Sequence, residues 1–259
     1  MRLTALAGCF LCAANLCWAQ SPLPGTPPES SAYDVSDPQQ DAGGAEDSSP
    51  PAERDAPGFN WKGTLAQSGM LLGVQHSLRM VQKKTRVHLG GPFWPDYRKS
   101  VAGLRGWNDG NPVITNYVGH PMMGAIAGYI QVQNDPGGIA LEWDPRNPQY
   151  WQSRFKALGW ASVYSTNYEL APWGEAGIGN VGYDSGTMGY VDLVVTPFAG
   201  FGMVLLEDYL DRKVIRKIEQ GKSERRARLL RVILNPQRSI SNLLRFKRPS
   251  HRDTRDLSD

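Results

Sequence analysis

The stretch NPVITNYVGHPMMGAIAGYIQVQNDPGG, residues 111–138, contains both a helix start and a helix stop. In Asn111-Pro112 the asparagine can cap a helix, and the proline fits the first helical position because its missing N–H has no intrahelical partner there. Small and apolar residues follow until the run ends at Asp135-Pro136-Gly137-Gly138. Since the same Asn-Pro pair recurs at 147–148 and 235–236, the sequence predicts a mainly α-helical fold.

His120 stands directly before Pro121 inside this stretch. A proline in a helix interior would remove the hydrogen bond to the carbonyl of Tyr117, so we expect the helix to restart at Pro121 with His120 at its N-terminal cap. Free N–H groups and the positive end of the helix dipole disfavour an imidazolium there. A neutral imidazole can be a metal ligand, a general base or a hydrogen-bonding group that holds the turn, and the sequence leaves all three roles open.

Apolar spacing and turn residues indicate the other elements. Leu71, Val74, Leu78 and Val81 recur at helical spacing and predict one buried face. A glycine-rich loop is expected over residues 174–189, and no strand alternation or internal repeat is present. The prediction is a helical, bundle-like single domain with long irregular loops, whose further helices cover about 62–84, 96–107, 148–170 and 190–220.

The two ends of the chain differ from its middle in composition. Residues 1–19 have the layout of a secretory signal peptide, and they contain all three cysteines, so the mature chain is expected to have no disulfide, thiol nucleophile or thiolate metal site. Residues 20–58 are rich in Pro, Ser and acid, and predict a disordered acidic linker. A helical domain is expected over 59–221, followed by a basic amphipathic region over 222–259.

That C-terminal region alternates arginines with leucine and isoleucine. The pattern is typical of a segment that lies on an anionic membrane surface through Arg225, Arg226, Arg228 and Arg231. The alternative is a solvated helix whose leucines dock onto the domain. Nucleic acid is not an expected partner of an exported chain.

Four carboxylates could accompany His120. Buried carboxylates are unfavourable unless they are paired, protonated or bound to a cation. His120, Glu169, Glu175 and Asp192 are the candidate catalytic residues, and His120, Glu169, Asp192 and Glu207 are the candidate metal ligands. Such an oxygen-rich set suits Mg²⁺, Mn²⁺ or Ca²⁺ better than structural zinc. The alternative is a buried polar network that fixes helix register.

The block Asn116-Tyr117-Val118-Gly119-His120-Pro121-Met122-Met123-Gly124 resembles the Asn-Tyr-x-Gly-His-Pro-x-x-Gly motif of an uncharacterised family of exported bacterial proteins, a domain of unknown function. The resemblance spans about residues 105–210. Tyr168-Glu169 looks like the family's aromatic-Glu step, and Glu175 looks like its second Glu. Asp192 looks like the Asp that precedes an apolar run in the family, and the stretch from Gly202 to Glu207 is similar to its last Gly-x-x-x-Glu region. The later matches depart from the pattern, with Tyr in place of Trp and Leu206 in place of Gly. The resemblance implies site residues but no activity.

The sequence therefore predicts an exported protein of the periplasm or cell envelope, with a binding or structural helical domain and a buried His/carboxylate cluster. One alternative is a metal-dependent or acid/base hydrolase that acts on an envelope component. An open pocket at the cluster would favour it. The other alternative is a multi-span integral membrane protein. It is suggested by the apolar run from Val191 to Leu206 and by the pairs Gly69-x-x-x-Gly73 and Gly124-x-x-x-Gly128, at which helices can approach closely.

Overall fold

The computed structural model describes residues 58–220 and 224–253, and this part of the chain is mainly helical and contains no strand. The predicted signal peptide and all but the last residue of the predicted linker lie outside the described residues. The helices run in the order α2 (Trp61–Arg79), α3 (Lys83–Arg86), α4 (Phe93–Ala102), the π-helix η1 (Thr115–Gly119), α5 (His120–Asn134), α6 (Pro136–Ile139), α7 (Pro148–Leu170), α8 (Val191–Leu210), the π-helix η2 (Asp211–Ile215), α9 (Arg216–Glu219), α10 (Glu224–Leu234) and α11 (Pro236–Leu244). The predicted fold class is confirmed.

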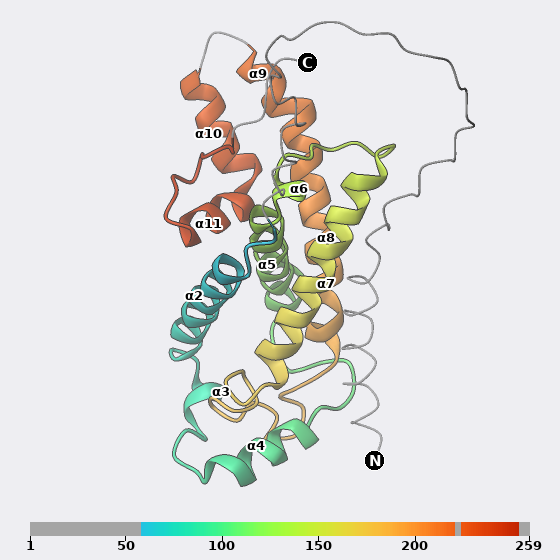
Figure 1. The fold of residues 1–259 in the computed structure, drawn as a ribbon. Coiled ribbons are helices and arrows are strands. Elements are labelled where there is room, and N and C mark those ends of the chain that lie inside the picture. The colour runs from blue at the N-terminus through green and yellow to red at the C-terminus, as the bar shows by residue number, and fades with distance from the viewer. Residues whose placement is uncertain (1–57, 221–223, 254–259) are drawn as a thin grey trace, which may run out of the picture. The chain divides into compact units, whose positions relative to one another are not determined.

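Helix α5 is the centre of the domain (Figure 1). It packs against α7 and α8 on one side and against α2 and α11 on the other. Ile126 and Ile130 meet Leu71 of α2, while Tyr129 and Val132 belong to a second cluster with α7 and α8. A helix that is apolar on nearly all sides, as the sequence of α5 is, becomes stable when neighbours cover it on several faces.

Glycine allows α5 and α8 to come very close together. A Cβ at Gly124 would lie 2.0 Å from the carbonyl oxygen of Thr196, and one at Gly200 would lie 2.8 Å from the carbonyl oxygen of Pro121. The close approach expected at Gly124 is confirmed. At Gly69 and Gly73 of α2 an added Cβ would meet nothing within 4 Å, so the same expectation was wrong there.

The predicted buried face of α2 was also wrong. Leu71 is buried, but Val74, Leu78 and Val81 are exposed, and the helix ends at Arg79 instead of Lys84. The buried face of α2 is mostly polar because other helices supply hydrogen-bond partners: the Nδ2 of Asn134 donates to Gln67, and the Tyr164 hydroxyl donates to Gln75. The spacing of apolar residues distinguishes the two faces of a helix, but it does not show which face other helices cover.

The helix predicted over 148–170 and the loop over 174–189 are confirmed. The helix expected over 96–107 runs from Phe93 to Ala102 instead. Of the three Asn-Pro starts, only Asn147 caps with its side chain, which accepts a hydrogen bond from the backbone N–H of Gln149. Asn111 instead bonds to Asp109, and the Nδ2 of Asn235 donates to Asp211.

The predicted long helix over 190–220 is observed as α8, η2 and α9, which form one continuous segment, Val191–Glu219. This segment is the one described helix that is long and apolar enough to cross a membrane by length and composition, and 33% of its apolar window is buried in the domain. An apolar core helix of a soluble domain meets the same criterion. Its outward face carries Val194, Phe198 and Leu206, all exposed.

Candidate functional site

The chain does not restart at Pro121. The π-helix η1 runs directly into α5, and His120 has helical backbone angles, φ −63° and ψ −45°, with its N–H bonded to the carbonyl oxygen of Thr115. The expectation that His120 caps a new helix was therefore wrong. A π-turn pairs residues five apart, so it widens the backbone just before Pro121 and accommodates a residue that has no N–H to donate.

Three helix ends bring His120, Glu169 and Asp192 together. His120 begins α5, Glu169 is the last residue but one of α7, and Asp192 is the second residue of α8. In Figure 1 these ends lie at the lower end of the bundle, near α3 and α4. One ligand atom from each residue lies within 4.8 Å of the other two. Two ligands of a cation bound at 2.0–2.6 Å are at most about 5 Å apart, so the three atoms fit around one ion.

Two carboxylate oxygens in this cluster have no hydrogen-bond partner in the described structure. Glu169 is 3% exposed and Asp192 is 2% exposed, and the Glu169 Oε1 and Asp192 Oδ1 atoms are both unsatisfied. The Nδ1 of His120 is 3.5 Å from Asp192 Oδ1, which is too long for a good hydrogen bond. Buried acceptors without donors are unfavourable, so these oxygens have unused capacity to bind a proton or a cation.

The protonation of the cluster follows from its burial. Burial raises the pKa of Glu169 well above its usual value, and the charges of Glu175 and Asp192 add to the effect. Burial also raises the pKa of Asp192 to about 8, with a further contribution from Asp109. Burial lowers the pKa of His120, so its imidazole is neutral. The sequence predicted a neutral imidazole for another reason, the dipole of a helix that restarts at Pro121, whereas η1 continues into α5.

The surroundings of the cluster carry more negative than positive charge. Glu175 is paired with Arg79, whose Nε lies 2.8 Å from Glu175 Oε1. Asp109 accepts from Asn116 at 2.6 Å, and Lys84 donates to Asn111 rather than to a carboxylate. Four carboxylates, those of Asp109, Glu169, Glu175 and Asp192, therefore share this end of the domain with the cations Arg79 and Lys84. If all four carboxylates are ionised, the two cations leave a net charge of −2 among the described residues that influence the cluster. One divalent cation would neutralise this charge.

Glu207 lies elsewhere. It is fifteen residues after Asp192 on the same helix, about 22 Å along the axis. Its carboxylate accepts hydrogen bonds from the backbone N–H groups of Gln237 at 2.8 Å and Arg238 at 3.2 Å, and thereby caps α11. The prediction that Glu207 belongs to the same metal site was wrong, because a single helix cannot bring both of its ends to one ion.

Three residues of the site were not predicted from the sequence. Asp109 and Asn116 are both buried and bonded to each other, and Arg79 reaches the site from the last turn of α2. Asn116 had a usable signal, since it opens the motif that contains His120. Asp109 lies in an Asn-Asp-Gly stretch that reads only as a turn, and Arg79 is too distant in sequence for any spacing rule.

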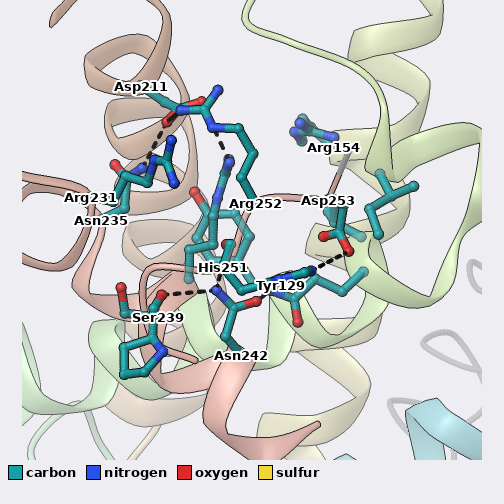
Figure 2. Close-up of a pocket in the computed structure, with 15 residues that line it drawn as sticks. Tyr129, Arg154, Asp211, Arg231, Asn235, Ser239, Asn242, His251, Arg252 and Asp253 are labelled. Atoms are coloured by element: carbon teal, nitrogen blue, oxygen red, sulfur yellow. Dashed lines mark hydrogen bonds and ion pairs between the residues drawn. The ribbon is translucent and has the colours of Figure 1, made fainter. Parts of the chain in front are cut away.

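A second polar region, at the other end of α8, has a structural role. Its cavity of about 30 Å³ is lined by Tyr129, Arg154 and residues of the C-terminal segment, and has room for about two water molecules (Figure 2). The Nδ2 of Asn242 donates to the carbonyl oxygens of Pro249 and His251. Arg252 pairs with Asp211. These contacts hold the segment from Pro249 to Arg252 against α11 and the end of α8.

No protein-family model matches the chain, and no curated protein or solved structure matches it either. The resemblance to the exported family of unknown function therefore stays a prediction.

Proposed function

We propose that this chain is an exported cell-envelope protein whose helical domain binds one divalent cation through His120, Glu169 and Asp192. The observation that carries the proposal is the convergence of three ligand atoms from three helix ends, two of them buried carboxylate oxygens without a hydrogen-bond partner. The export part of the proposal rests on the signal-peptide pattern of residues 1–19 and the acidic linker that follows it.

Mn²⁺ is the cation that fits the ligands best. Two carboxylates suit Mg²⁺, Ca²⁺ and Mn²⁺ alike, but Mg²⁺ and Ca²⁺ prefer oxygen ligands throughout. The imidazole of His120 adds a nitrogen, which a transition-metal ion accepts more readily. Water molecules and Asp109 would complete or support the coordination sphere, with Asn116 holding Asp109 in place.

The bound cation would join the ends of α5, α7 and α8. Without it, two buried carboxyl groups must be protonated to avoid repulsion, and each protonation competes with metal binding. The cation therefore stabilises the folded domain in addition to any further role. This agrees with a binding or structural function for the cluster.

A metal-dependent or acid/base hydrolase acting on an envelope component is the second candidate. One observation favours it: the side chain of His120 retains 14% exposure, while Asp192 beside it is at 3%. The cluster thus reaches the protein surface at a neutral imidazole, the form that a general base requires.

Metal content and stability test the cation site together. Residues 20–259, purified and freed of metal with a chelator, would be dialysed against Mn²⁺, washed, and analysed for bound metal by mass spectrometry. We expect near-stoichiometric Mn²⁺ and a free energy of unfolding that rises by about 2.7 kcal/mol when Mn²⁺ is present at a hundred times its Kd.

The variants Glu169→Gln and Asp192→Asn should lose the metal and the stabilisation by Mn²⁺. They should still fold without metal, because each replaces a buried carboxyl group by an uncharged amide of nearly the same shape. Glu207→Gln is the matched control: it changes a buried carboxylate of the same helix α8 outside the cluster, and it should bind Mn²⁺ as the parent does. No bound metal in the parent, or equal binding by all variants, would disprove the cation site.

A further inference from the structure

Helix α10 turns one row of apolar side chains away from the domain. Leu229 is 61% exposed and Ile233 is 60% exposed, whereas Ala227 on the opposite face is buried. Val232, on the same outer face, is exposed as well. Helix α11, in contrast, packs its Ile240 against the hydrophobic core. Leu229 and Ile233 therefore do not dock onto the domain, whereas Leu230 and Leu234 are half-buried on the side of Ala227. The exposed apolar stripe is left without a partner in the described structure.

Arginines border this stripe. Successive residues of a helix are rotated by about 100°, so Arg226 lies on one side of the line through Leu229 and Val232, and Arg228 lies on the other. Arg225 extends the stripe at its N-terminal end. All three arginines are exposed. An apolar centre with basic side chains on both flanks is the arrangement of helices that lie in the plane of a membrane interface.

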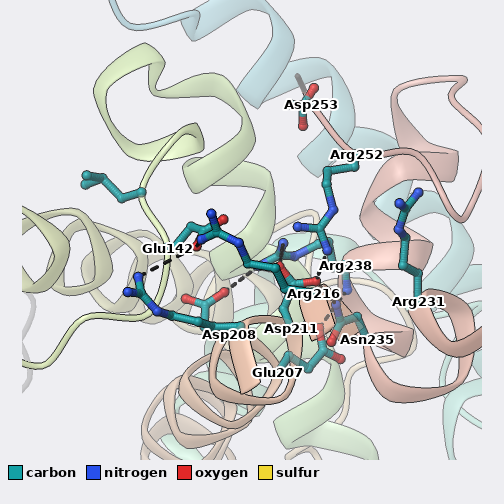
Figure 3. A network of polar contacts seen from close by, with 12 residues as sticks. Glu142, Glu207, Asp208, Asp211, Arg216, Arg231, Asn235, Arg238, Arg252 and Asp253 are labelled. Carbon is teal, nitrogen blue, oxygen red and sulfur yellow. Dashed lines mark hydrogen bonds and ion pairs between the residues drawn. The ribbon is translucent and has the colours of Figure 1, made fainter. Parts of the chain in front are cut away.

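Two other arginines of this region point into the domain. Arg231 pairs with Glu219 at 2.6 Å, and Arg238 pairs with Asp208 (Figure 3). From residue 225 to residue 252 the chain has no acidic residue, so this segment carries a large excess of positive charge. Arg231, which was predicted to face a membrane with the other three, instead faces inward.

A second apolar side chain lies in the segment fastened to α10. Phe246 is 88% exposed, with φ +57°, and the exposed Lys247 and Arg248 follow it. The Nη1 of Arg231 donates to the carbonyl oxygen of Ser250, which ties this segment to α10. The C-terminal region thus repeats the combination of an exposed apolar residue with basic neighbours.

We propose that α10 docks the domain on the surface of an anionic lipid bilayer. Leu229, Val232 and Ile233 enter the boundary between headgroups and acyl chains, and Arg225 and Arg226 contact lipid phosphates. The positive flanks complement the negative surface, and each arginine near such a surface strengthens binding. The surface is independent of the cation site, so either proposal can fail alone.

A second copy of the chain fits this surface less well. A stable interface buries about 800 Å² on each partner, more than three apolar side chains on an eleven-residue helix provide. Two copies that met through the stripe would also bring their arginines together, and like charges oppose such a contact.

Vesicle sedimentation tests the proposal. Residues 20–259 would be titrated with vesicles of phosphatidylcholine and phosphatidylglycerol in equal parts, and with vesicles of phosphatidylcholine alone. We expect binding to the anionic vesicles that weakens steeply with added salt. The double variant Arg225→Gln/Arg226→Gln should bind about 25-fold more weakly, and Leu229→Ser/Ile233→Ser about tenfold more weakly.

Each variant has a matched control elsewhere on the surface. Arg86→Gln/Arg146→Gln removes two exposed arginines, and Leu65→Ser/Leu78→Ser removes two exposed leucines of α2. Both controls should bind like the parent. All variants are on exposed positions, and circular dichroism with thermal unfolding would verify that they fold.

Two results would overturn the proposal. In one, the parent does not prefer anionic vesicles, or the α10 variants bind no more weakly than the controls. In the other, analytical ultracentrifugation shows a dimer that only the α10 variants disrupt, which would make this surface an interface between copies of the chain.

Discussion

Replacing Asp208 by asparagine should remove a large part of the stability of the domain. Asp208 is buried and accepts hydrogen bonds from Arg154 Nε at 2.6 Å and the Tyr150 hydroxyl at 3.0 Å, and it also pairs with Arg238. Burial alone would raise the pKa of Asp208, but the two arginines outweigh it and lower the pKa. The charge of Asp208 is therefore what allows two guanidinium groups to lie inside the protein.

The size of the effect follows from what remains after the substitution. Arg238 keeps Asp211 at 3.6 Å, so it still has an acidic partner. Arg154 is 1% exposed and keeps hydrogen bonds to carbonyl oxygens, such as that of Leu141 at 3.0 Å, but it loses its counter-charge. Removing one partner of a buried ion pair costs about 3–5 kcal/mol, and since one arginine is left unpaired rather than two, we expect about 4 kcal/mol.

Urea unfolding followed by circular dichroism would measure this loss of free energy. Asp184→Asn is the matched control, because the side chain of Asp184 is 63% exposed and pairs with His88 at 2.9 Å. An exposed pair contributes between about 0 and 1 kcal/mol, so the control should unfold nearly as the parent does. A loss below about 1 kcal/mol for Asp208→Asn would refute the argument that Asp208 neutralises a buried arginine.

Three further predictions concern packing, pH and solubility. Gly124→Ala should destabilise the domain by about 1–3 kcal/mol in chemical unfolding because α5 must move away from Thr196, whereas Gly69→Ala should stabilise it by up to about 1 kcal/mol; equal effects of the two would contradict the packing. Burial raises the pKa of Glu207 to about 7, although the N–H groups that it caps oppose the change. The folded state therefore holds this proton more tightly, and its contribution to stability, at most about 3 kcal/mol, is lost as pH rises from about 4.5 to about 7; in Glu207→Gln this part of the slope should be missing. Residues 20–259 should be monodisperse without detergent in size-exclusion chromatography, and a requirement for detergent would instead favour an integral membrane protein.

The helices were predictable where local signals act alone. The run from Asn147-Pro148 to Leu170 has its start and end in its own residues, and the helix over 148–170 was predicted correctly. The π-turn before Pro121 was not predictable from the sequence. The same residues are compatible with a helix that restarts at Pro121 and with a continuous helix that contains a π-turn before it. The buried face of α2 depended on Asn134 and Tyr164, which are distant in sequence and supply its polar partners.

The candidate site was predictable in its residue types and only partly in its membership. His120, Glu169 and Asp192 share an environment because each stands at a helix boundary. The end of α7 and the start of α8 were inferred from the sequence, but the join of η1 and α5 was not. Glu207 shared their chemistry but lay at the wrong end of α8. Asp192 and Glu207 are separated by about 22 Å along α8, and the residue type alone does not indicate this separation.

The pulsed electron paramagnetic resonance spectrum of Mn²⁺ bound to residues 20–259 tests the cation site most directly, since nitrogen modulation identifies an imidazole bound to the metal. We expect one Mn²⁺ per chain with modulation from a single directly bound nitrogen. We also expect that His120→Gln loses the modulation and that His88→Gln retains it. Mn²⁺ without bound nitrogen in the parent, or modulation that survives His120→Gln, would contradict the assignment of His120, Glu169 and Asp192 as the site.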